Sequence, residues 1–458
     1  MIGFILLAGL AMSYGWGMRG LLIGGEKGAV LPGALVGLVL AKCSGIPVLA
    51  DNCALFSAIG AMGTAFGGFE PYAESSDFLC SRDPKKRDLK KGGIGIGLKG
   101  ANWFGISGTF LGIGFTAMTG NVYRWYEFVI FFLLEPFIQA LGVRIFNKPY
   151  DRDKKIFPKL YFSEESREEW GGNSLMLVIL LCWAAAHRDW FAVGFGIVGI
   201  VAGAIGWIIA YKMDEYTSYP LKNGKYIFGS LQPKGYIDNW KIMEFSFGCV
   251  GGLAFSAYFC AQYSHIQNLA FQMENKGIWN PLGEYSDLAA WIAFALVFVT
   301  AIQYVFVFRA QKQGKEVDMH IFEVLERPLF FAVPFALVML GGKTMAELYC
   351  FPVIMWLAVE KNLFDRLENI PEKKIIKPVT AVLFAVILVL TVVLHGVFPM
   401  WAKILMYTIF YIASDFVYLL FNPHAKERGG ALKYYRSLIT VYGCYFVQTA
   451  VLFLTLCR

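Results

Sequence analysis

The chain has 458 residues, of which 57% are hydrophobic and only 16% are charged, and its formal net charge is +7. Its mean hydropathy is +0.52. A water-soluble protein has roughly 25% charged residues, so this chain has too little polar surface to cover soluble domains. The composition therefore excludes a secreted disulfide scaffold, a disordered protein and a cytosolic enzyme. We expect an all-α, polytopic integral membrane bundle.

Apolar segments recur along the whole chain. A spanning helix needs about 20 mostly apolar residues, and we predict about fourteen spans, or as few as twelve because some segments are short or broken. The predicted spans are 2–18, 28–42, 46–70, 94–118, 122–145, 173–187, 190–211, 241–262, 288–308, 328–342, 344–360, 378–398, 401–421 and 435–457. The segments between them are too short for a soluble domain. We therefore expect a single transmembrane domain over 1–458.

The positive charges alternate between the segments that join these spans. Most of the 41 Lys and Arg residues fall in every second joining segment, and 82–91 and 144–172 are particularly rich in them. The positive-inside rule places these segments in the cytoplasm. We expect a multi-pass protein of the plasma or inner membrane whose partners are the lipid bilayer and a small-molecule solute. A homo-oligomer is compatible with the sequence, and we expect no nucleic-acid binding because no basic stretch is interleaved with aromatic residues.

Cysteine and histidine spacing argues against a metal or redox centre. None of the nine cysteines forms a CxxC pair, and the five histidines form no HxxxH or HExxH pattern. Cysteines in apolar runs act as small hydrophobes, and a metal site needs several ligands at defined spacing. We expect no metal and no cofactor. In the absence of a GxxxxGK[ST] loop or a GxSxG elbow, we also name no catalytic residue.

The stretch 14–33 combines seven glycines with an arginine, a glutamate and a lysine. Glycine permits tight turns and close approach of a ligand. The helix expected from about residue 28 would favour an anion at its N-terminus. Broken helices of this kind often form transporter sites. We predict that the substrate-binding residues here are Tyr14, Trp16, Arg19, Glu26 and Lys27. The alternative is a tight cytoplasmic turn closed by ion pairs among these charges.

Charged residues within predicted spans are costly and are therefore candidates for function. Three polar residues lie towards the predicted cytoplasmic ends of their spans, at the level of the glycine-rich stretch, and could share one polar chamber with it. We add them to the substrate-binding residues: Glu70, Lys99 and Asn102. Three carboxylates are predicted to carry a coupling ion: Glu135, which precedes a proline, Glu244 and Asp415.

Two segments share a pattern that suggests an internal repeat. Asn-Trp at 102–103 precedes glycines at 108 and 112, and Asn-Trp at 239–240 precedes glycines at 248 and 252. Glycines four residues apart let helices approach closely, so tight packing is one interpretation and sliding surfaces for a conformational cycle are the other. The two tryptophans, Trp103 and Trp240, are expected to anchor the membrane interface.

These features favour a secondary active transporter, which would move a small polar or anionic organic solute in symport with H⁺ or Na⁺. The alternative is a membrane-embedded enzyme, such as a transferase that acts on a lipid or lipid-linked, phosphate-bearing substrate at the same charged rim. A channel or a structural scaffold is a third class. We expect a transporter rather than an enzyme, and turnover in detergent would reverse that expectation.

Overall fold

The computed structural model describes residues 1–22, 25–69, 78–79, 87–164, 168–221, 223–297, 328–354 and 431–456, with isolated positions between them. Across these ranges the regular secondary structure is helical, apart from one isolated β-bridge between Asp151 and Ile156. The all-α prediction is confirmed for this part of the chain. Glu70, Asp415 and the side chain of Glu26 lie outside the described residues.

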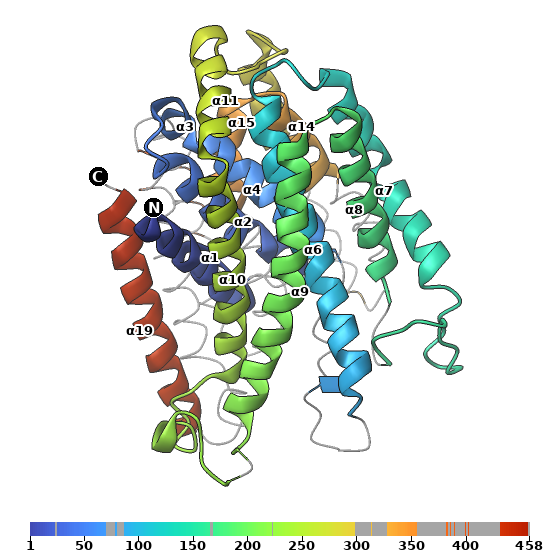
Figure 1. Ribbon diagram of the computed structural model, residues 1–458, viewed down its shortest axis with the longest axis vertical. Helices are drawn as coiled ribbons and strands as arrows, with labels where there is room; N and C mark the ends of the chain where they lie inside the picture. The colour runs from blue at the N-terminus through green and yellow to red at the C-terminus, as the bar shows by residue number, and fades with distance from the viewer. Residues whose placement is uncertain are drawn as a thin grey trace.

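The helices of the described residues differ widely in length. In chain order they are α1 (Ile2–Leu22), α2 (Gly25–Lys42), α3 (Pro47–Asp51), α4 (Cys53–Gly67), α6 (Leu89–Ala117), α7 (Trp125–Phe146), α8 (Trp170–Ala186), α9 (Trp190–Ser218), η3 (Gly229–Leu231), α10 (Asn239–Ala261), α11 (Tyr263–Lys276), η4 (Pro328–Ala332), α14 (Val333–Met339), α15 (Lys343–Leu348), η5 (Tyr349–Val353) and α19 (Ala431–Leu456). A further apolar helix covers Tyr285–Val297. The long helices α6, α7, α9, α10 and α19 run roughly along the long axis of the molecule (Figure 1).

Close helix pairs form the centre of the bundle. α6 packs along α9, α2 along α4, and α1 along α10. Glycines make these contacts possible: a Cβ on Gly33 of α2 would clash with the carbonyl oxygen of Gly60 in α4, and one on Gly203 of α9 would clash with that of Gly100 in α6. Small residues of this kind let helix backbones approach one another. For these glycines, the packing interpretation accounts for the contacts.

The two segments of the suggested repeat pack in a similar way. Gly112 of α6 lies against Ala192 of α9, and Gly252 of α10 lies against Ala8 of α1. Their tryptophans differ, because Trp103 is fully buried whereas Trp240 is half-buried. The expected interface position is therefore wrong for Trp103, whose ring packs inside the bundle. The repeat itself stays a prediction.

Four of the described helices are long and apolar enough to cross a membrane, judged by length and composition. They are Trp125–Phe146, Trp190–Ser218, Asn239–Ala261 and Arg436–Leu456. The predicted count of fourteen spans is not supported. α4 has only 15 residues and is buried over nearly its whole length, while α6 is long but rich in glycine. A helix that is covered by other helices needs less apolar surface than a helix that faces lipid. The number of spans therefore cannot be determined from hydropathy alone.

An exposed apolar stripe runs along α7. Its members recur every three or four residues and therefore share one helix face: Ile130, Leu133, Leu134, Phe137 and Leu141. α9 and α19 expose apolar side chains in the same manner, for example Ile205 and Phe446. A large contiguous apolar surface is unusual on a soluble monomer and marks contact with lipid or protein.

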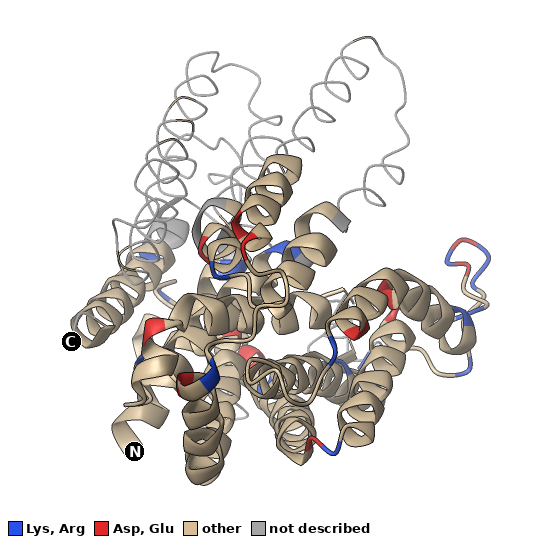
Figure 2. Cartoon of the chain, turned by 90° about the horizontal axis from the view of Figure 1, so that it is seen from above, with Lys and Arg blue, Asp and Glu red and all other residues tan. Residues whose placement is uncertain are grey.

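Many charged residues lie in the segments that join the helices. Figure 2, seen down the long axis, shows mostly uncharged helices and several charges in the loop at its right edge, which joins α7 to α8. The start of α6, the α7–α8 loop, the α9–α10 connection and the start of α19 all lie towards the lower end in Figure 1. These are four of the segments predicted to be cytoplasmic, and the structure places them towards one end of the described helices.

Candidate functional site

Arg19, near the end of α1, is buried against tryptophan rings. The residue is only 4% exposed. The guanidinium carbon lies 5.1 Å from the ring centroid of Trp16 and 5.0 Å from that of Trp103 in α6. These distances are typical of cation–π contacts, which strengthen when they are removed from water. The structure thus brings together two of the predicted substrate-binding residues, Trp16 and Arg19.

Trp16 belongs to an aromatic cluster, the tryptophan cluster, formed by Trp16, Trp103, Trp207 and Phe247. The centroid of Trp16 lies 4.9 Å from that of Trp103 and 4.6 Å from that of Phe247. Trp207 stacks on Phe247 with centroids 4.9 Å apart. The four rings come from α1, α6, α9 and α10, and all are fully buried. Edge-to-face and stacked pairs of this kind stabilise packing by about 0.5–1.5 kcal/mol each beyond burial, so the cluster fixes four helices around Arg19.

A buried ion pair on α10 completes the site. Lys241 Nζ lies 2.5 Å from Glu244 Oε2 and donates a hydrogen bond of 3.0 Å to the carbonyl oxygen of Gly17. Gly17 precedes Arg19 by two residues, so Lys241 ties α10 to the charged end of α1. Buried ion pairs add little net stability, whereas charges within spans are commonly functional. Glu244 was predicted to carry an ion, while Lys241 was not predicted.

Two buried polar atoms of this site accept or donate no hydrogen bond among the described residues. They are the indole nitrogen Nε1 of Trp16 and the carboxylate oxygen Oε1 of Glu244. The first is a donor and the second an acceptor. A buried polar group without a partner costs about 1–3 kcal/mol. A water, ion or solute that offers an acceptor to Trp16 and a donor or cation to Glu244 would therefore be stabilised here.

The polar residues predicted on α6 face other neighbours. Asn102 Nδ2 donates to the carbonyl oxygen of Trp170 at 3.2 Å and to Ser174 Oγ at 2.9 Å, so Asn102 joins α6 to α8. Lys99 is buried one turn before Trp103. Burial raises the pKa of Glu168, just before α8, although the nearby positive charge of Lys99 opposes the shift. Asn102 therefore lies in the contact between α6 and α8, whereas Arg19 lies against Trp16 and Trp103.

Tyr14 and Lys27 contact the C-terminal half of the chain. The hydroxyl of Tyr14 accepts a 2.9 Å hydrogen bond from Thr449 Oγ1, and its ring centroid lies 5.6 Å from that of Tyr445 in α19. Lys27 Nζ lies 5.7 Å from the ring centroid of Phe330 in η4. Tyr14 therefore faces α19, and Lys27 lies beside η4.

The glycine-rich stretch differs from the predicted half-helix. α1 continues to Leu22 and α2 begins at Gly25 rather than near residue 28. A Cβ on Gly15 would clash with the backbone of Pro32, and one on Gly17 would clash with the ring of Phe245. The described glycines at 15 and 17 therefore serve close helix packing, which the sequence could not separate from ligand approach.

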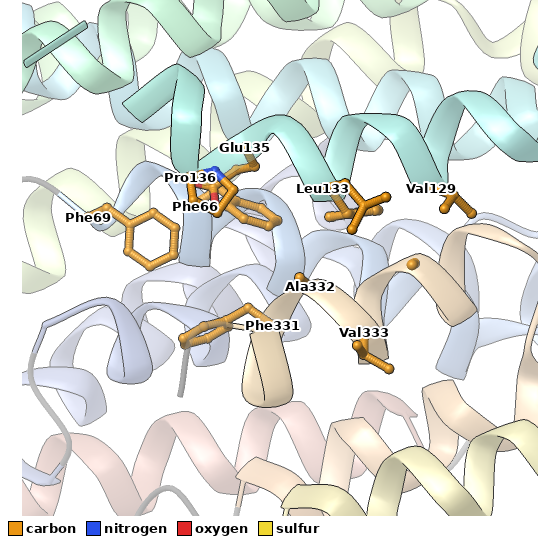
Figure 3. A pocket seen from close by; sticks show the side chains of 11 residues that line it. Phe66, Phe69, Val129, Leu133, Glu135, Pro136, Phe331, Ala332 and Val333 are labelled. Atoms are coloured by element: carbon orange, nitrogen blue, oxygen red, sulfur yellow. The ribbon is translucent and has the colours of Figure 1, made fainter. Parts of the chain in front are cut away.

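Glu135 lies in a second location. It is only 2% exposed and lines a cavity of about 230 Å³ between α4, α7, η4 and α14 (Figure 3). None of the residues that line this cavity belongs to the tryptophan cluster or its ion pair. Of the three carboxylates predicted to carry a coupling ion, Glu244 therefore lies in the buried ion pair with Lys241, and Glu135 lines the cavity. Asp415 lies outside the described residues.

The sequence alone suggested no role for three residues of this site, Lys241, Trp207 and Phe247. Lys241 had a detectable signal, because residues three apart on a helix are neighbours and Glu244 would need a cation. Trp207 and Phe247 had none, since aromatic residues are frequent throughout the chain and their convergence depends on long-range packing. No family model matches the chain, and its comparison with curated proteins and with solved structures found no match either.

Proposed function

We propose that the chain is a polytopic membrane transporter of a small polar or anionic organic solute, coupled to H⁺ or Na⁺. The observation that supports this most is the buried group of Arg19, which lies against two rings of the tryptophan cluster, and the ion pair of Lys241 and Glu244. Ionised side chains within membrane-spanning bundles are rare and mark substrate or ion pathways. In a protein without such a role, apolar side chains would fill the same space at lower cost.

The membrane part of the proposal is supported by four long apolar helices and by the exposed apolar stripe on α7. We propose a multi-pass protein of the plasma or inner membrane that has twelve to fourteen spans in one transmembrane domain. The cytoplasmic side would be the end where the α7–α8 and α9–α10 connections lie (Figure 1). This orientation follows from the positive-inside rule.

In the proposed mechanism, Arg19 and the indole N–H of Trp16 bind the anionic group of the solute. Glu244 accepts the coupling ion at its Oε1 atom. Binding of a cation there would weaken the attraction between Glu244 and Lys241, and Lys241 in turn holds the carbonyl oxygen of Gly17. The contact between α1 and α10 would then depend on whether the ion is bound. A ligand shifts a conformational equilibrium by its differential affinity for the two states, which this linkage would supply.

Uptake by proteoliposomes tests the proposal. We would load the purified chain into vesicles, impose a proton or a sodium gradient, and measure uptake of a panel of labelled carboxylates, amino acids and phosphate esters. We expect saturable uptake of at least one solute under one gradient, and loss of gradient dependence in Glu244→Gln. Glu284→Gln, in an exposed turn, is the matched control. If no solute moves under either gradient, the transport proposal is wrong. A new chemical product formed in detergent would favour a membrane enzyme.

A further inference from the structure

The exposed apolar stripe of α7 ends beside basic side chains. Ile145, which is 56% exposed, lies four residues after Leu141 and therefore continues the stripe towards the end of the helix. Arg144 lies three residues after Leu141 on the same face, and Lys148 follows just beyond the end of α7. Both basic residues are exposed, and the ion pairs of the described residues involve neither of them. The stripe thus changes from apolar to cationic within about one or two helical turns.

A short hairpin follows in the segment that joins α7 to α8. The amide of Asp151 donates a hydrogen bond of 2.9 Å to the carbonyl oxygen of Ile156, and the amide of Ile156 donates one of 2.8 Å to the carbonyl oxygen of Asp151. The base of the hairpin is aromatic, because the ring centroid of Phe157 lies 5.8 Å from that of Tyr150 and 4.7 Å from that of Tyr161. These contacts hold the backbone that carries the basic residues of this segment.

The segment is strongly basic and also exposes apolar side chains. Residues 144–160 include six Lys and Arg residues and two Asp residues, and one of these, Asp151, lies 2.9 Å from Lys154 in an ion pair. Exposed basic and apolar side chains alternate towards its end: Lys155, Ile156, Lys159 and Leu160. Such a mixture is typical of a surface that lies among lipid headgroups. An acidic soluble partner would account for the charge but not for the apolar residues.

The hairpin projects sideways from the bundle. Figure 2 shows the α7–α8 segment outside the helices at its right edge, and in Figure 1 the segment lies beside the lower end of α7. If the long helices cross the bilayer as proposed above, this segment lies over lipid rather than over protein. The proposed orientation places it at the cytoplasmic leaflet, which contains anionic lipids that attract basic segments.

We propose that this end of α7 binds an anionic phospholipid, with its acyl chains along the apolar stripe and its phosphate group against Arg144 and Lys148. A guanidinium group can bind a phosphate with two parallel hydrogen bonds, and a lysine adds a point charge. Lys155 and Lys159 attract the same layer of headgroups. This inference rests on the membrane part of the proposed function, and it adds a lipid site that is separate from the solute site at Arg19.

Native mass spectrometry of the full chain in mild detergent tests the lipid site. Phosphatidylglycerol and phosphatidylcholine with identical acyl chains would be titrated separately, because only phosphatidylglycerol has a net negative charge. We expect phosphatidylglycerol to bind at least about fivefold more tightly, and Arg144→Gln/Lys148→Gln to lose this preference while phosphatidylcholine binding stays unchanged. The matched control, Lys225→Gln/Lys234→Gln, removes two exposed cations from the α9–α10 connection at the same end of the molecule and should change neither affinity.

A charge-conserving variant, Arg144→Lys/Lys148→Arg, should keep the preference for phosphatidylglycerol. Equal affinities for the two lipids would overturn the proposal and would mean that these cations only offset the carbonyl groups at the end of α7. An equal loss in the control variant, or displacement of the lipid by soluble glycerol phosphate, would also overturn it. A dimer that Arg144→Gln/Lys148→Gln abolishes would replace the lipid with a second copy of the chain.

This result and that of the uptake experiment can be told apart, because lipid binding needs neither a gradient nor the transported solute. A chain that stays dispersed without detergent would contradict the membrane part of the proposed function and the lipid site with it. A chain that transports a solute but does not distinguish the two lipids would contradict the lipid site alone.

Discussion

The tryptophan cluster and the Glu135 cavity both contain a buried carboxylate, but their surroundings differ. Glu244 is paired with Lys241 at 2.5 Å in a core filled by aromatic rings. Glu135 lines a cavity that reaches the outer face of the bundle. A paired charge in filled space can exchange its partner only if helices move. The described residues thus include a filled region around Glu244 and a hollow region beside Glu135.

Breaking the ion pair should have the largest effect on stability. Lys241→Met leaves Glu244 buried without its cation, and such a change costs about 3–5 kcal/mol. We expect this loss in the free energy of unfolding, measured by urea denaturation in mild detergent. The double variant Lys241→Met/Glu244→Leu should recover much of it, because it removes the stranded charge. A loss of less than about 1 kcal/mol in the single variant would show that the pair is not buried as the structure has it.

A methyl group added to the filled region should be the next most damaging change. In Gly100→Ala the new Cβ would clash with the carbonyl oxygen of Gly203 and the ring of Trp207. We expect a loss of about 1–3 kcal/mol, as for other overpacked cores. Gly93→Ala, in the same helix α6, is the matched control because its Cβ would meet open space. It should be neutral or stabilise by up to about 1 kcal/mol. Similar melting temperatures for the two variants would contradict the close α6–α9 contact.

The hollow region should respond to added volume in the opposite way. Ala332→Leu adds apolar atoms to the cavity wall, where space is present. We expect the free energy of unfolding to stay the same or to rise by up to about 1 kcal/mol, as is common for cavity-filling substitutions. Thermal unfolding would measure it beside Gly100→Ala. A loss as large as that of Gly100→Ala would mean that the cavity is not open.

The smallest change in stability is expected at Asp189, a buried carboxyl at the N-terminal cap of α9. Burial raises the pKa of Asp189 above its ordinary value of 3.8, although hydrogen bonds from the Ala192 amide and the Tyr123 hydroxyl oppose the shift. Because the folded pKa is the higher one, this group stabilises the fold most below pH 3.8, and that stabilisation is lost as the pH rises through the folded pKa.

Asp189→Asn should therefore raise the melting temperature slightly at pH 7, since asparagine also serves as a helix N-cap. The difference from the unchanged protein should shrink as the pH falls towards 4. Melting curves recorded at a series of pH values would measure it. A difference that grows on acidification would contradict the direction of the shift.

Composition predicted the helical class, and the position of Glu244 within an apolar run indicated that this charge is buried, because charges within apolar runs are visible in sequence. They could not predict that Lys241 reaches the carbonyl oxygen of Gly17, which lies 224 residues earlier. Nor could they separate a helix with an exposed apolar face, such as α7, from one buried among helices, such as α4. Hydropathy measures how apolar a segment is, while its surroundings are set by long-range packing. The same limit explains why the hydrogen bonds from Asn102 to Trp170 and Ser174 could not be predicted.

The central claim is that the buried charges around Arg19 bind the transported solute. Solute uptake by proteoliposomes, compared between the unchanged protein, Arg19→Gln and Glu284→Gln, tests it most directly. We predict that Arg19→Gln loses about tenfold or more of the initial rate at low solute concentration, as is typical when a buried charged contact is lost, while Glu284→Gln keeps the full rate. Uptake by Arg19→Gln at the unchanged rate and with the same saturation would contradict the claim.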